Sequence, residues 1–159
     1  MGIQVEAVFE DREINEFLEG MSSRLSSVKQ GDKKYTGLLS AIVFRDVIEH
    51  FAGQQGSEGP WKQWSASYRK AMNKAGHGGN KILQWTGKLR QDFKPTNVKP
   101  SSAGPIWFNN AQTKSGFPYA FAHNEGGSVL PKRDFMWLSE DAGESIAEKT
   151  LQFMLDEGI

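Results

Sequence analysis

The feature that most constrains the fold is a broad apolar helix face in the first third of the chain. Between Thr36 and Phe51, large apolar residues recur at steps of three and four, which is the period of an amphipathic α-helix. A stripe this wide favours burial between layers of structure over packing on one neighbour alone. The residues that form it are Leu38, Leu39, Ile42, Val43, Val47, Ile48 and Phe51.

Four further helices are predicted from cap residues that precede helical patterns. Side-chain oxygens of Asp, Ser and Thr can accept the free amide hydrogens of a first helical turn. Acidic residues at the start of the last segment also suit the helix dipole. The four segments are 11–25 behind Asp11, 65–75 behind Ser65, 86–93 behind Thr86 and 139–155 behind Ser139.

Short runs of aromatic and β-branched residues predict strands at 3–9, 106–108, 119–121 and 132–138. We expect 106–108 and 119–121 to form a hairpin with a long loop, and 132–138 to add a third strand. The chain is long enough to bury a core without cross-links. The sequence therefore predicts a single α+β domain, residues 1–159, in which a small antiparallel β-sheet packs with N-terminal, central and C-terminal helices.

Charge is distributed unevenly along a chain whose net charge is zero. Residues 61–99 hold nine Lys or Arg against one acid, whereas residues 1–60 hold six basic and ten acidic side chains, and residues 100–159 hold four and eight. This pattern of about −4, +8 and −4 suggests a molecule that must be oriented, either head-to-tail against its own copies or with one face toward an anion. A solvated basic loop between acidic helical ends would give the same pattern.

Composition limits the kinds of site and the cellular compartment that we expect for this protein. The chain has no cysteine, which excludes disulfides, thiolate metal sites and a cysteine nucleophile. No apolar run approaches the ~20 residues of a membrane span. The start of the sequence also lacks the charged and apolar regions of a secretory leader. We expect a soluble protein, made in a reducing compartment and without membrane contact.

Residues that commonly carry catalysis form no recognised pattern. We expect His50 to face solvent or the helix dipole, His77 to be exposed, and His123 to make a structural hydrogen bond at a strand end. No serine lies in a Gly-x-Ser-x-Gly elbow, and the glycine-rich stretch 76–81 lacks the order of a phosphate loop. Glu58 is a candidate glycosidase acid without a matched carboxylate. The sequence therefore predicts no enzyme, no cofactor and no metal site.

Contact with nucleic acid is a stronger alternative. Aromatic side chains are interleaved with the basic residues of 61–99, and such a series can follow a phosphate backbone. No reader motif is present, and zero net charge removes long-range steering toward DNA. Non-specific contact with DNA stays open, whereas sequence-specific reading is not expected.

Four segments, taken in order, resemble the landmarks of a known family. They are Gly59–Tyr68 (GPWKQWSASY), Ile82–Arg90 (ILQWTGKLR), Tyr119–Gly126 (YAFAHNEG) and Lys132–Ser139 (KRDFMWLS). Together they are similar to the phage virion morphogenesis or tail completion family. The element Leu-x-x-Thr-Gly-x-Leu-Arg in the second segment is the most characteristic. One departure is Asp134, which stands where the family usually has proline.

The resemblance implies a small non-enzymatic α+β protein that acts at the head–tail joint or completes the tail of a bacteriophage. Family members often form rings, and we favour a hexamer because phage tails are six-fold. The expected location is the virion, at the tail or the head–tail junction, after synthesis in the cytoplasm of the bacterial host. Expected partners are copies of the chain itself and other phage tail or neck proteins, with non-specific contact to DNA in the ring lumen as a further possibility.

A ring needs two edges that fit each other, and separated acidic and basic surfaces can supply them. We expect exposed aromatic residues such as Trp61 or Trp64 to anchor this interface, so that replacing Trp61 or Arg90 disrupts assembly more than folding. A different interpretation is that 60–68 clamps its loop to the core. Two other functions stay open, a DNA-binding module of a mobile element and a phage cell-wall hydrolase. The interface candidates are Trp61, Trp64, Tyr68, Arg69, Lys88, Arg90, Arg133 and Phe135.

Overall fold

The computed structural model describes residues 12–29, 32–101, 104–128 and 130–155. These residues form an α+β fold, as predicted. The helices are α1 (Arg12–Lys29), α2 (Lys33–Gly53), α3 (Ala66–Lys74), α4 (Lys88–Gln91), α5 (Tyr119–Glu125) and α6 (Glu140–Leu155). The strands are β1 (Gln55–Gly56), β2 (Gly59–Pro60), β3 (Val98–Lys99) and β4 (Ile106–Trp107).

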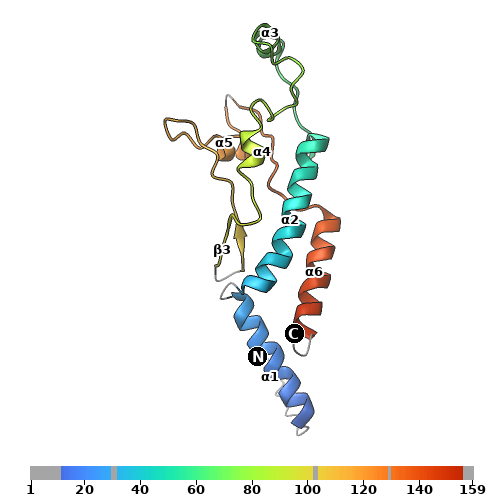
Figure 1. Cartoon of the computed structure of the whole chain (residues 1–159). Helices are drawn as coiled ribbons and strands as arrows, with labels where there is room; N and C mark the ends of the chain where they lie inside the picture. Colours follow the sequence, from blue (N-terminus) through green and yellow to red (C-terminus); the bar gives the residue numbers. More distant parts are fainter. Residues whose placement is uncertain (1–11, 30–31, 102–103, 129, 156–159) are drawn as a thin grey trace, which may run out of the picture.

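The protein is elongated, with α1 at one end and α3 at the other (Figure 1). Helix α2 runs through the middle of the molecule, and α6 lies beside it (Figure 1). The short helices α4 and α5 sit together on the other side of α2, above the ladder formed by β3 and β4 (Figure 1). Helix α2 is therefore buried between two layers, as its wide apolar face predicts.

Helix α2 begins and ends with recognisable caps. The Asp32 side chain accepts a hydrogen bond from the backbone N of Tyr35 at 2.7 Å, which satisfies one free amide of the first turn. At the other end, Gln54 adopts a left-handed conformation with φ of 55°, and its N–H bonds to the carbonyl of His50. The helix is thus longer at its start than the predicted segment, which began at Thr36.

The core lies along the second half of α2. Phe51 packs edge-on against Trp61, with ring centroids 5.6 Å apart, and tilted against Phe135 at 5.1 Å. Helices α4 and α5 each contribute to the same cluster, through Leu89 and Ala120 respectively. Burial of these side chains, each contributing about 1.5–3 kcal/mol for a large aliphatic or aromatic group, holds the layers together.

A second, smaller cluster joins the other end of α2 to α6. The Tyr35 ring packs against Phe153 with centroids 5.0 Å apart, and the Tyr35 hydroxyl shares a hydrogen bond of 2.8 Å with the hydroxyl of Thr150. Because both contacts lie in the C-terminal half of α6, they fix which face of that helix turns toward α2.

The predicted hairpin is wrong. Residues 106–107 do form a strand, but β4 pairs antiparallel with β3, in the register Val98 with Trp107 and Lys99 with Ile106. The segment expected to pair with it, 119–121, lies in helix α5 instead. The other ladder joins β1 to β2 across a tight turn, with Gln55 opposite Pro60. The fold therefore has two separate two-stranded ladders within the described ranges, where one small sheet was predicted.

The segment 132–138 is not a strand either, because its backbone amides bond to a side chain and to a helix end. The side-chain carbonyl of Asn124 accepts hydrogen bonds from the backbone N of both Phe135 and Met136, each at 3.1 Å. The backbone N of Arg133 donates to the carbonyl of His123 at 2.8 Å. The strand predicted at 3–9 lies outside the described residues.

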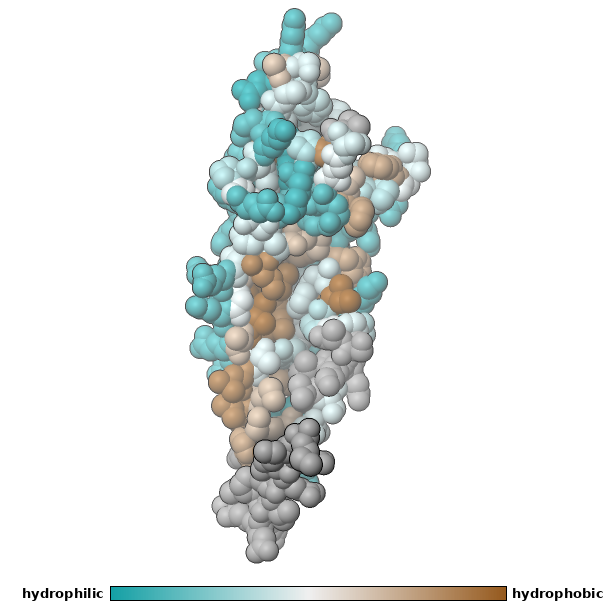
Figure 2. Space-filling view, turned by 180° about the vertical axis from the view of Figure 1, so that it is seen from behind, coloured by the Kyte–Doolittle hydropathy of each residue, from teal (hydrophilic) through white to brown (hydrophobic). Residues whose placement is uncertain are grey.

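Apolar surface gathers on the side of the molecule where α2 and α6 lie, and it continues toward the C-terminal end of α6 (Figure 2). Exposed leucines on α6, Leu151 and Leu155, belong to that end. In the described part of the chain, no helix combines the length and apolar character that a membrane crossing requires.

Candidate functional site

The four segments that resemble family landmarks meet around one open cavity of about 1110 Å³. Each segment contributes to the lining, for example through Trp64, Leu83, Tyr119 and Arg133. The walls are completed by loop residues Gln112, Thr113, Lys114, Gly127, Ser128, Leu130 and Pro131. We call this cavity the basic groove, because four cations and no carboxylate line it: Lys62, Lys88, Lys114 and Arg133.

Aromatic side chains form the other part of the lining. Trp64 and Tyr68 pack edge-to-face, with ring centroids 5.6 Å apart, across the start of α3. The cap of this helix is the predicted one, since the Ser65 hydroxyl accepts from the backbone N of Tyr68 at 3.2 Å. Trp85 also lines the groove, and 56% of its surface is exposed. Exposed aromatic rings beside cations suit an interface or a stacking ligand.

Arg133 is the buried cation of the groove, with 7% of its surface exposed. Its Nε donates a hydrogen bond to the carbonyl of Lys62 at 2.9 Å, so it ties the fourth segment to the first. Burial lowers the pKa of the Arg133 guanidinium below its ordinary value. Burial and the positive charge of Arg133 together lower the pKa of the nearby His123 as well. Arg133 thus contributes a largely buried positive charge to the lining of the groove.

Lys88 is presented by the turn that begins α4. Gly87, with φ of 72°, takes the N-cap position of α4, a left-handed conformation that glycine adopts without strain. Thr86, the predicted cap, therefore lies one residue before the N-cap; its hydroxyl accepts a hydrogen bond from the backbone N of Lys88 at 3.3 Å. A hydrogen bond to Asp92, 2.6 Å from Lys88 Nζ, raises the pKa of Lys88. One of the four cations is thus already paired.

The predicted interface residues fall into three groups. Trp64, Tyr68, Lys88 and Arg133 line the basic groove. Arg69 and Arg90 are exposed but lie outside its lining. Trp61 and Phe135 are in the core, with 3% and 0% of their surfaces exposed.

The expectation that Trp61 is an exposed anchor is therefore wrong. Its ring packs on Phe51, and its Nε1 donates to the carbonyl of Asp134 at 2.8 Å. The interpretation that this loop is clamped to the core is the correct one for Trp61. Phe135 is likewise buried and is not an interface anchor. Its backbone is held against α2 by His50 and against α5 by Asn124.

Asp134 explains how the loop between β1 and β2 is held. Its carboxylate accepts hydrogen bonds from the backbone N of Ser57 at 3.1 Å and from the Ser57 hydroxyl. Burial alone would raise the pKa of Asp134, but these bonds and the charge of Lys132, 3.7 Å away, outweigh it and lower the pKa. A proline in this position would leave Ser57 without that acceptor.

Sequence reasoning missed Lys62, Trp85, Lys114 and Tyr119 as members of the groove. Lys62 and Trp85 lie in the first and second landmark segments, close in sequence to the predicted interface residues. Their position in these segments was the signal that could have identified them. Lys114 comes from a turn between β4 and α5 that no pattern connects with α3 or α4. Tyr119 is half-buried in the groove lining, and this burial raises the pKa of its hydroxyl.

The predictions for two histidines are wrong. His50 is buried, its Nδ1 lies 3.0 Å from the carbonyl of Phe135, and its ring stacks on Trp137 at 4.1 Å. His123 lies in helix α5, not at a strand end, and its buried Nδ1 has no hydrogen-bond partner within the described residues. No group of three or more His, Asp or Glu is arranged to hold a metal ion in the described ranges.

Glu58 and Asp134 flank Lys132, whose Nζ lies 3.3 Å and 3.7 Å from their carboxylate oxygens. The two carboxylates invite comparison with the carboxylate pair of a glycosidase, for which Glu58 is the candidate acid. However, a general acid needs a raised pKa, whereas that of Asp134 is lowered. The pair is better explained as an ion-pair network on the loop surface.

Comparisons with protein-family models, curated proteins and solved structures found no match to this chain.

Proposed function

We propose that this protein is a structural component of a bacteriophage virion that acts in tail completion or head–tail joining. It does so by assembling into a ring with its own copies and docking to neighbouring virion proteins. The observation that carries this proposal is the meeting of all four landmark segments around the basic groove, although they are spread over residues 59–139. Segments so far apart in sequence contribute to one surface. This is expected if the segments form a docking site together, and it is not expected if each is only a structural turn.

The chemistry of the groove supports a protein partner. Its lining combines aromatic rings and an arginine, residue types enriched at interfaces, with three lysines that can attract an acidic partner surface. The opposite charge is carried elsewhere on the same chain, in the acidic first and last thirds. A ring made by a repeated contact between unlike surfaces needs this separation of charge. The six-fold symmetry of phage tails favours six subunits.

Electron microscopy of the purified protein, with and without purified tail tubes, tests this function. We expect ring-shaped particles, and a ring at one end of each tube in the mixture. The same mixture prepared with bovine serum albumin controls for non-specific deposits. Tubes with unchanged ends, together with particles of monomer size at every concentration, would contradict the proposal.

A second candidate function is non-specific contact with DNA, favoured by the four cations and the exposed Trp85 of the groove. Both features suit a phosphate backbone with stacked bases. A fluorescence titration with duplex and single-stranded DNA at low and moderate salt tests it. Binding that weakens steeply as salt rises supports this candidate, and the absence of binding at low salt rejects it.

A further inference from the structure

Helix α6 carries a mixed acidic and apolar face that no described residue covers. Four exposed acids, Glu140, Asp141, Glu144 and Glu148, run from its start to its middle, and two exposed leucines, Leu151 and Leu155, follow toward its end. At about 100° per residue, all six project within a sector of about 100°. We call this sector the outer face of α6. None of the four acids forms an ion pair within the described ranges.

The inner face of α6 is already occupied. Ile146 and Phe153 pack into the clusters on α2, and the Thr150 hydroxyl bonds to Tyr35. The outer face is therefore turned away from α2 and is available to a partner. Acids near a helix start also stabilise its dipole, but this effect fades after the first turn. It does not account for Glu148 or for the leucines.

The basic groove complements this face in both charge and apolarity. Lys62 and Lys114 are exposed, and neither side chain makes a hydrogen bond or ion pair within the part of the chain that the structure describes. The same lining includes Trp85 and Leu83, which offer apolar contact. A helix that presents carboxylates and then leucines would satisfy both kinds of groove residue at once.

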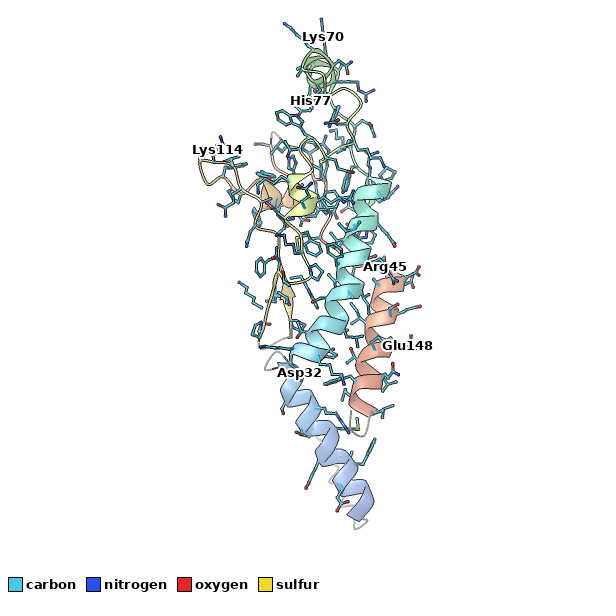
Figure 3. The ribbon with its side chains drawn as sticks, in the orientation of Figure 1. Asp32, Arg45, Lys70, His77, Lys114 and Glu148 are labelled. Atoms are coloured by element: carbon cyan, nitrogen blue, oxygen red, sulfur yellow. The ribbon has the colours of Figure 1, made fainter. Side chains whose placement is uncertain are left out.

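We propose that the basic groove of one chain receives the outer face of α6 from a second copy of the chain. This inference rests on the proposed function, since it names the contact from which the ring is built. Lys114 and Glu148 lie on opposite sides of the molecule (Figure 3). One chain therefore offers its groove to one neighbour and its α6 to another, and such a head-to-tail contact closes into a ring or grows into a filament.

Charge reversal on each surface tests the inference. One variant carries Lys62→Glu with Lys114→Glu, and the other carries Glu144→Lys with Glu148→Lys. Each variant alone places like charges across the contact, so its dissociation constant should rise by ~100-fold and light scattering should report monomers where the wild type is oligomeric. An equal mixture of the two variants restores opposite charges at every contact. We expect that mixture to regain the oligomer, with the two variants alternating.

A matched control reverses two exposed lysines of α3 outside the groove, Lys70→Glu with Lys74→Glu, and should keep the wild-type mass. Circular dichroism on every variant checks that the fold is retained. Oligomers that survive both groove and helix reversals, or a mixture that stays monomeric, would overturn the inference. If the wild type forms rings but the variants give either of these results, the proposed function is retained and the ring is built from a different contact between chains. A wild type that is monomeric at all concentrations overturns both.

Discussion

The carboxylate of Asp46 in α2 accepts two hydrogen bonds from Ser139, one from its backbone N at 3.0 Å and one from its hydroxyl at 2.5 Å. The Ser139 hydroxyl in turn accepts from the backbone N of Ala142 at 3.2 Å, which makes it the N-cap of α6. The central helix thus fixes where α6 begins. This contact also sets which way the outer face of α6 points.

Asp46→Ala is expected to lower the free energy of unfolding by about 1–3 kcal/mol, because the half-buried amide and hydroxyl of Ser139 lose their acceptor. Urea unfolding followed by circular dichroism measures the change. Glu49→Ala, at an exposed position of the same helix, serves as the control and should change stability by less than about 0.5 kcal/mol.

The pairing of these residues is testable separately. Ser139→Ala in the Asp46→Ala background should cost less than Ser139→Ala alone, with a coupling of roughly 1 kcal/mol. Fully additive effects would show that the two residues stabilise the fold independently.

Trp61→Ala is expected to destabilise the folded chain by about 3–5 kcal/mol, the usual cost of removing a buried aromatic side chain. Trp85→Ala should cost less than about 0.5 kcal/mol, because that side chain is mostly exposed, but it should weaken assembly. Thermal unfolding together with light scattering separates the two effects. A Trp61→Ala variant that keeps wild-type stability but no longer forms oligomers would show that Trp61 is an interface residue after all.

His123 makes stability depend on pH. Its pKa in the folded chain lies below the ordinary value of 6.5, so the unfolded chain binds a proton first as the pH falls. The contribution of neutral His123 is therefore complete above about pH 7.5 and declines as the pH drops through 6.5 toward the folded pKa.

Urea unfolding of the wild type and of His123→Gln at about pH 7.5 and about pH 5.5 measures this contribution. The loss of stability between these two pH values should be smaller in the variant, because glutamine does not titrate. An equal loss in both proteins would show that other groups carry the pH dependence.

The long helices could be predicted from the sequence because their signals are local. Ser65 stands next to the turn that it caps, as predicted, and the apolar period of α2 covers several turns, although its cap at Asp32 was not predicted. Helix α5 was read as a strand because Tyr119 and Phe121 favour strands locally, and a seven-residue helix is too short to show a period.

The groove was only partly predictable. Trp64, Tyr68, Lys88 and Arg133 lie in segments with recognisable landmarks, so they were found. Trp61 belongs to the same segment, and nothing in the local sequence tells a buried tryptophan from an exposed one. The difference comes from the carbonyl of Asp134, which lies more than seventy residues away and accepts the indole hydrogen. Burial set by such distant partners cannot be inferred from local spacing.

The central claim is that the basic groove binds the outer face of α6 from another copy, and carbodiimide crosslinking tests it most directly. This reagent joins an amine to a carboxylate only where the two are in contact. The sample is an equal mixture of isotopically heavy and light protein, so mass spectrometry distinguishes links between chains from links within one. We predict mixed-isotope links from Lys62 or Lys114 to Glu144 or Glu148. Assembled protein in which these lysines link only within a chain, or only to other carboxylates, would contradict the account.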